Sequence, residues 1–162
     1  MANERADIAM TEDEVRGFLA AGRTLVLVTI GPDGVPDPVP MWFVLDDDGD
    51  VWMRTYAASQ KVVNLRRDPR VAVLVETGDR YVELRGVQVT GRIELVDDVD
   101  RICAVFADLM VKYEGVDPAH RAAVMEGYRA KAAKQVALRL VPERVVSWDH
   151  RKQAAVRAAP AG

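Results

Sequence analysis

Six short stretches of strand-forming residues, separated by turns and helices, limit what this chain can fold into. They are rich in β-branched and other apolar residues, and several alternate apolar with polar side chains, as antiparallel strands do. The stretches lie at residues 23–30, 35–45, 51–54, 70–76, 81–95 and 135–148. Helical patterns occur as insertions around them. The sequence therefore predicts a mainly β or α+β fold, with a barrel as the favoured closure.

Prolines at alternate positions mark the second stretch as an edge strand. Pro36, Pro38 and Pro40 would all present the same side of a strand to a neighbour. Proline has no N–H to donate to a β-ladder, so these positions must face an edge or lie outside regular pairing. The sequence predicts an edge whose free backbone groups can contact a ligand.

Helix boundaries are also marked. Residues 11–14, with the sequence Thr-Glu-Asp-Glu, form a capping box before a helix that ends at Gly22, a predicted left-handed cap. A second helix begins at residue 97 or 98 and ends before Gly115. Within the long strand at residues 81–95, we expect a bend at Gly86.

Length and composition favour one folded domain. The chain has 162 residues, of which 49% are hydrophobic and 29% are charged, a composition typical of a folded protein. We expect a single domain over residues 11–149, a disordered N-terminus over residues 1–10 and a mobile tail over residues 150–162. The sequence predicts no repeat and no second domain.

Charge and hydropathy exclude two classes of partner. No apolar run approaches the roughly 18 residues of a membrane helix, and the N-terminus lacks the pattern of a signal peptide. We therefore expect a cytoplasmic protein with no membrane partner. The net charge of −3 argues against general affinity for nucleic acid.

Few residues offer acid–base, nucleophilic or metal chemistry. His120, His150 and the buried-type Cys103 are too few and too dispersed for a metal site, and residues 46–50 match a calcium loop only faintly. No hydrolase or phosphate-loop motif is present. This composition fits a redox enzyme whose cofactor performs the chemistry, and we identify no catalytic side chain.

The segment at residues 51–69 has features of a phosphate site. A short strand ends at Arg54 and Thr55, and a short helix opens at Ser59, a plausible N-cap. Lys61 falls in the first helical turn, where a cation is unfavourable unless an anion is bound. The sequence predicts that these four side chains converge on one phosphate. Solvated charges on an ordinary strand–turn–helix are the alternative.

This segment resembles the phosphate-binding segment of the pyridoxamine 5'-phosphate oxidase-like split-barrel flavoproteins, in which Ser-x-Lys is followed by Leu and Asp-Pro. Residues 61–71, KVVNLRRDPRV, resemble more closely the actinobacterial flavin/deazaflavin oxidoreductases of the FDOR-B-like branch, which often use coenzyme F420. The resemblance runs from about Thr11 to Trp148. It implies a homodimeric split β-barrel of the FMN-binding, Greek-key type, with peripheral helices and cofactor sites at the subunit interface.

The resemblance also implies which residues contact the cofactor. In the family the second strand lines the flavin ring, which corresponds here to Val39, Pro40, Met41 and Trp42. Around the phosphate the candidates are Arg54, Thr55, Tyr56, Ser59, Lys61, Asn64 and Arg67. Tyr81 and Trp148 are candidate walls of a substrate pocket, with core packing as the alternative.

The leading functional hypothesis is a coenzyme F420-dependent oxidoreductase that transfers a hydride to a conjugated or quinone-like acceptor. Residues 61–70 hold four cations against one carboxylate, a net charge of +3, which suits the anionic tail of this deazaflavin. Arg66, Arg67 and Arg70 would hold that tail, unless they pair with the acidic residues 46–50.

Two alternatives remain open. An FMN-dependent enzyme of the same fold is the first, although residues 38–42 lack the cations of a true pyridoxamine-phosphate oxidase and the C-terminal Arg-x-His signature is absent. A protein that binds haem, another tetrapyrrole or a cofactor without turnover is the second.

Overall fold

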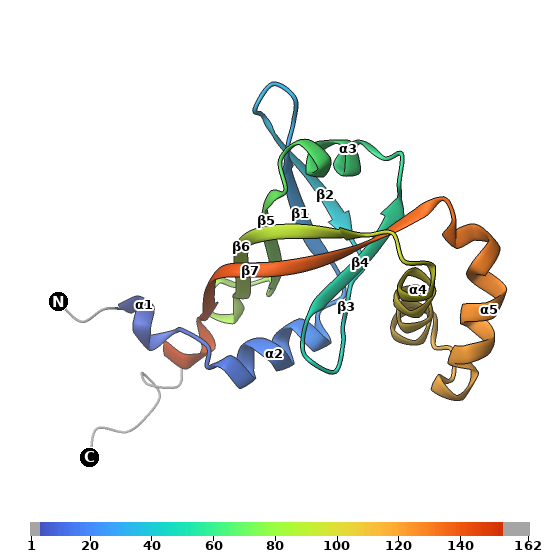
Figure 1. Cartoon of the computed structure of the whole chain (residues 1–162). Helices are drawn as coiled ribbons and strands as arrows, with labels where there is room; N and C mark the ends of the chain where they lie inside the picture. The colour runs from blue at the N-terminus through green and yellow to red at the C-terminus, as the bar shows by residue number, and fades with distance from the viewer. Residues whose placement is uncertain (1–3, 154–162) are drawn as a thin grey trace, which may run out of the picture.

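The computed structural model describes residues 4–153, which build one curled antiparallel sheet flanked by helices (Figure 1). Its strands β1 to β7 are Leu25–Ile30, Pro36–Met41, Val44–Leu45, Val51–Tyr56, Arg70–Thr77, Arg85–Val96 and Gln135–Asp149. They lie in the order β2-β1-β5-β6-β7-β4-β3, and all neighbours are antiparallel. The predicted α+β split-barrel class is confirmed.

The helices α1 to α5 are Glu4–Asp7, Glu12–Ala21, Gln60–Arg67, Val99–Glu114 and Arg121–Ala132, with 3-10 turns η1 at Tyr81–Glu83 and η2 at Pro118–His120. The capping box at Thr11 is confirmed, and Gly115 has the left-handed φ of 70°. Gly22 does not: its φ is −61° and ψ 139°. Glycine fits there because a Cβ would lie 2.9 Å from the Val75 side chain.

The proline-rich strand β2 forms one edge of the sheet, as predicted. Pro36, Pro38 and Pro40 stand opposite alternate residues of β1 and are exposed. Because proline has no N–H, the ladder with β1 cannot use these positions as donors.

The two longest strands, β6 and β7, pair along most of their length and form the ribbon that crosses the middle of the sheet (Figure 1). The strand predicted at residues 81–95 begins at Arg85, and its irregularity falls between Thr90 and Gly91 instead of at Gly86. Gly86 has a different role, since the indole of Trp148 fills the space where its Cβ would be.

Buried side chains form two clusters on opposite faces of β4. Met53 belongs to the cluster inside the curl of the sheet, with Leu27 and Phe43. Its neighbour Trp52 belongs to the cluster beneath α4 and α5, with Cys103. This division follows from the alternation of side chains along a strand. The same alternation determines to which face of the sheet each later side chain of β4 points.

Within residues 1–10, for which we predicted disorder, the structure describes the short helix α1 and a contact with the end of β7. The Ile8 carbonyl accepts from the N–H of Asp149 at 2.7 Å. Lys152 donates to the Ala9 carbonyl at 2.7 Å and pairs with Glu14 at 2.6 Å, which also lowers the pKa of that carboxyl. Residues 1–3 and 154–162, and with them most of the predicted tail, lie outside the described residues.

Within residues 4–153, none of the helices has both the length and the apolar character that a membrane span requires.

Candidate functional site

Helix α3 begins directly after β4, at the upper end of the sheet in Figure 1. Ser59 has the backbone of an N-cap, with φ −70° and ψ 152°, but its side chain makes no capping hydrogen bond. The predicted hydroxyl cap is therefore wrong. The hydroxyl lies 3.4 Å from Thr55 Oγ1 instead. The N–H groups of the first turn thus keep their capacity to bind an anion.

Thr55, Ser59 and Lys61, here called the Lys61 cluster, come together around this turn. Lys61 Nζ donates to Thr55 Oγ1 at 3.3 Å, and Thr55 is 9% exposed. The cluster combines a cation, two hydroxyl groups and the positive end of a helix. Those are the groups that bind phosphate oxygens in proteins. Three of the four residues predicted to converge therefore do so.

Arg54 does not join them, which corrects the fourth part of that prediction. Its Nη1 donates to Tyr128 Oη at 2.8 Å and to Gln135 Oε1 at 3.0 Å. Its guanidinium lies 4.8 Å from the Phe106 ring centroid, on the α4–α5 side of the sheet. Arg54 and Thr55 are consecutive residues of a strand, so their side chains point to opposite faces.

Tyr56, the last residue of β4, is 65% exposed and forms no wall of the Lys61 cluster. The strand alternation places it on the same face as Arg54 and Tyr128. Burial raises the pKa of Tyr128, which keeps that phenol protonated as a partner for the Arg54 guanidinium. Arg54, Tyr56 and Tyr128 thus lie on one face of β4, and the Lys61 cluster lies on the other.

Asn64 and Arg67 both bond other parts of the chain and so anchor α3. Asn64 is completely buried and donates to Thr29 Oγ1 at 3.0 Å, so its side chain faces the sheet. Arg67 Nη2 donates to the carbonyl oxygen of Ile30. The apolar anchors of the helix are Val62 and Leu65, both buried in the sheet core.

The remaining cations of the segment differ in their availability. Arg70 forms a bidentate pair with Asp68, at 2.7 Å for the shortest contact, and this pairing lowers the pKa of Asp68 to about 2. Arg66 makes one long contact of 3.5 Å, to the Ala57 carbonyl. The acidic residues 46–50 bond elsewhere in the chain: Asp50 pairs with Arg139 at 2.9 Å. The alternative that Arg66, Arg67 and Arg70 pair with residues 46–50 is therefore wrong.

The predicted ring-facing residues follow one another along and just after β2. Val39 is half-buried, Pro40 is exposed and Met41 is buried. Trp42 is 45% exposed, and its ring stacks on Tyr113 of α4 with centroids 4.4 Å apart and an interplanar angle of 8°. The sequence missed Tyr113, because its spacing in an apolar helix indicates only core packing.

Tyr113 also fixes the chain immediately after Trp42. Its hydroxyl donates to the Phe43 carbonyl at 2.9 Å and accepts from the Phe43 N–H at 3.1 Å. Lys112 Nζ donates to the same carbonyl at 3.1 Å. Burial, reinforced by the nearby Arg23, lowers the pKa of Lys112 from 10.5 to about 8. The end of α4 thus holds the corner between β2 and β3.

Replacing Lys112 with methionine is expected to change how stability depends on pH. The pKa of Lys112 is lower in the folded chain than in the unfolded chain, so the unfolded chain binds more protons between pH 8 and 10.5. The free energy of unfolding of the wild type should therefore rise across this window relative to Lys112→Met. Urea denaturation at a series of pH values measures the difference, and a constant difference would refute it.

Tyr81 and Trp148 line one groove of ≈ 950 Å³, together with Arg144 and His150. Tyr81 is 70% exposed, and its ring packs on His150 with centroids 4.5 Å apart. The two predicted pocket residues therefore do share a cavity. Its lining includes no residue of β2 or α3.

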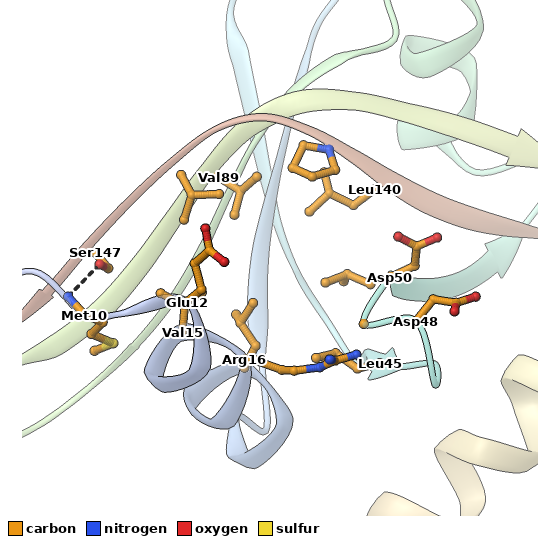
Figure 2. Close-up of a pocket in the computed structure, with 15 residues that line it drawn as sticks. Met10, Glu12, Val15, Arg16, Leu45, Asp48, Asp50, Val89, Leu140 and Ser147 are labelled. Carbon is orange, nitrogen blue, oxygen red and sulfur yellow. Dashed lines mark hydrogen bonds between the residues drawn. The ribbon is translucent and has the colours of Figure 1, made fainter.

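A second cavity of ≈ 660 Å³ lies between α2, the β3–β4 loop and the β6–β7 ribbon (Figure 2). Its walls are mainly apolar, such as Val89 and Leu140, and its rim carries Glu12, Arg16 and Asp48. Neither cavity reaches the Lys61 cluster, which is half-buried beside the first turn of α3. We place the candidate cofactor site at the cluster, because it combines a lysine, two hydroxyl groups and a helix end without a side-chain cap. No three metal-ligating side chains gather within residues 4–153.

Known proteins resemble the chain over nearly its whole length. A family model described as pyridoxamine 5'-phosphate oxidase matches residues 11–149. The conserved hypothetical protein Rv2991 from Mycobacterium tuberculosis is 41% identical, with a TM-score of 0.84 over 98% of this chain and 96% of that one. A solved F420 reductase is 25% identical, with a TM-score of 0.60 over 80% of this chain and 94% of that one.

More distant solved structures share the fold alone. The heme storage protein HutZ from Vibrio cholerae is 18% identical, with a TM-score of 0.62 over 84% of this chain and 94% of its own. No curated protein matches the chain.

Proposed function

Because the chain belongs to the pyridoxamine 5'-phosphate oxidase family, we propose that it is an oxidoreductase that uses coenzyme F420 to reduce a conjugated or quinone-like small molecule. The observation that carries the proposal is the Lys61 cluster at the uncapped end of α3. When bound, the reduced deazaflavin would supply the hydride. The chain would supply binding, orientation and electrostatics.

The residues present fit a phosphate-bearing, planar cofactor. Lys61 and the hydroxyl group of Ser59 would hold the phosphate, together with N–H groups of the first turn of α3. The strand β2 would lie against the ring system, and Trp42 would form one wall. Tyr113 keeps that indole in a single orientation through stacking and through its bonds to Phe43.

The choice of F420 over FMN has two supports. The solved F420 reductase is 25% identical to this chain. Arg66, whose one hydrogen bond among the described residues is the long one to Ala57, is available to pair with an anionic tail beyond the phosphate. Arg67 and Arg70 add positive charge near the site, although each bonds another group of the chain.

A titration of the purified protein with coenzyme F420, followed by deazaflavin fluorescence, tests the proposal. We expect F420 to bind at least about tenfold more tightly than FMN, a difference of about 1.4 kcal/mol. The deazaflavin riboside without the phosphate-bearing tail is the matched ligand and should bind weakly. Tighter binding of FMN would identify a flavin enzyme of the same fold. Binding of neither cofactor would overturn the proposal.

We also propose that two copies of the chain pair through the outer part of the β6–β7 ribbon. Val141, Val145 and Val146 are large apolar side chains exposed on the two faces of this part of β7, and exposed apolar surface of this kind marks protein interfaces. A dimer would also explain why neither cavity of one chain reaches the Lys61 cluster. The groove at Tyr81 and Trp148 is our proposed place for the acceptor, brought to the cofactor by the second copy.

A further inference from the structure

A partly buried hydrogen-bond network joins α3 to two strands of the sheet, and the buried side chain of Asn64 is its centre. The Asn64 side-chain nitrogen donates to Thr29 Oγ1 at 3.0 Å and to Asp37 Oδ2 at 3.1 Å. Its side-chain oxygen accepts from Gln60 Nε2 at 3.0 Å. Asn64 and Thr29 are both completely buried. One side chain therefore contacts β1, β2 and the first residue of α3.

The chemistry of the partners allows only one orientation of the Asn64 amide. The Asp37 carboxylate can only accept, so the Asn64 –NH2 must face it. The Asn64 oxygen then faces the Gln60 –NH2, and Gln60, which is exposed, can turn its own amide to match. Turning the Asn64 amide over would place two acceptors together at Asp37. The network is thus directional.

Apolar packing does not provide this direction. Val62 and Leu65 bury α3 against the core, but the hydrophobic effect is non-directional and does not pair particular atoms. The network fixes the helix at named atoms instead. Gln60 immediately precedes Lys61, and Asp37 lies two residues before Val39 in β2. The same network therefore spans the proposed phosphate-binding and ring-binding parts of the site.

We propose that Asn64 is a positioning residue, which sets the rotation of α3 on β1 and β2 and so aims Lys61 and the first-turn N–H groups at the phosphate. It does not touch the cofactor. For its effect on binding, this inference rests on the function proposed above. Asp37 is a second positioning residue, because its carboxylate in β2 accepts a hydrogen bond from the side-chain amide of Asn64.

A charge placed at the centre of the network tests the inference. Asn64→Asp sets a second carboxylate against Asp37, where the wild type has a hydrogen bond of 3.1 Å. We expect the dissociation constant for coenzyme F420 to rise by at least about tenfold. In the double variant Asn64→Asp/Asp37→Asn, the polarity is inverted and the bond can form again. Affinity should return to within about threefold of the wild type.

A control variant separates positioning from stability. Val105→Ala, in the α4 cluster far along the chain from α3, should lower the melting temperature without changing affinity. The apparent affinity for the cofactor is proportional to the folded fraction of the protein. A variant that is about 99% folded therefore loses only about 1% of its apparent affinity because of reduced stability. If Asn64→Asp is fully folded and binds as tightly as the wild type, the inference is overturned.

The amide spectrum of the ligand-free protein separates failure of this inference from failure of the proposed function. In Asn64→Asp the resonances of Thr55 and Lys61 should move, and the double variant should restore them. If the wild type binds neither F420 nor FMN but these shifts occur, the proposed function fails and the positioning role stands. If the resonances of Thr55 and Lys61 remain in place, Asn64 does not position the cluster, whatever the protein binds.

Discussion

Replacing Lys61 with alanine is expected to weaken binding of coenzyme F420 by about 10- to 150-fold. A charge-assisted contact between an ammonium group and a phosphate contributes about 1.5–3 kcal/mol, and each 1.4 kcal/mol corresponds to about tenfold in affinity. The structure supports this size, because Lys61 Nζ lies at the uncapped helix end and its contact in the chain, to Thr55 Oγ1, is long at 3.3 Å. Fluorescence titration at constant salt measures the loss.

The fold should change little in this variant. A lysine in the first turn opposes the helix dipole when no anion is bound, so its removal costs little stability or slightly increases it. Added salt should weaken the wild-type complex more than the variant complex, since one screened contact is gone. Lys131→Ala, which removes an exposed lysine from α5, controls for net charge and should bind normally. Equal losses in both variants would show that Lys61 makes no specific contact.

Replacing Gly91 with alanine is expected to destabilise the fold by about 3 kcal/mol. The Cβ would overlap the carbonyl oxygen of Val141 and approach Pro142 Cα to 3.1 Å. Both obstacles are backbone atoms, so no side-chain rotation can relieve them. The position also adjoins the irregularity of the β6–β7 ladder, on which β4 and its Thr55 depend.

Gly127→Ala is the matched control. Gly127 lies in α5, and a Cβ there would meet no atom within 4 Å. Alanine should stabilise that helix by about 0.5–1 kcal/mol, because it restricts the unfolded chain and favours helix. Urea denaturation compares the two variants. A Gly91→Ala protein as stable as the wild type would mean that the ribbon can shift, and that β4 is not held rigidly.

Local signals in the sequence predicted the fold well. The alternate prolines of β2 identified the edge strand, and Gly115 ended α4 as expected, because each depends on one residue's own backbone restrictions. Gly22 and Gly86 were misjudged because a glycine also allows close approach. Gly22 makes room for Val75, and Gly86 makes room for Trp148. Such partners are distant in sequence.

In the candidate site, too, the local contacts were predictable from the sequence and the distant ones were not. Thr55, Ser59 and Lys61 lie within seven residues of one another, and their association follows from local geometry. Arg54 was misplaced although strand alternation alone would have set it on the other face. The buried position of Asn64 depends on Thr29, 35 residues away. No local pattern could have revealed that contact.

The most direct test of the account follows the main-chain amide resonances of Gln60 and Lys61 while coenzyme F420 is added. If the phosphate binds at the first turn of α3, both resonances should move in proportion to the bound fraction. Inorganic phosphate should move the same two resonances and leave those of Tyr81 and Trp148 in place. Unchanged resonances of Gln60 and Lys61 at saturating cofactor would contradict the account, because the cofactor would then bind away from the Lys61 cluster.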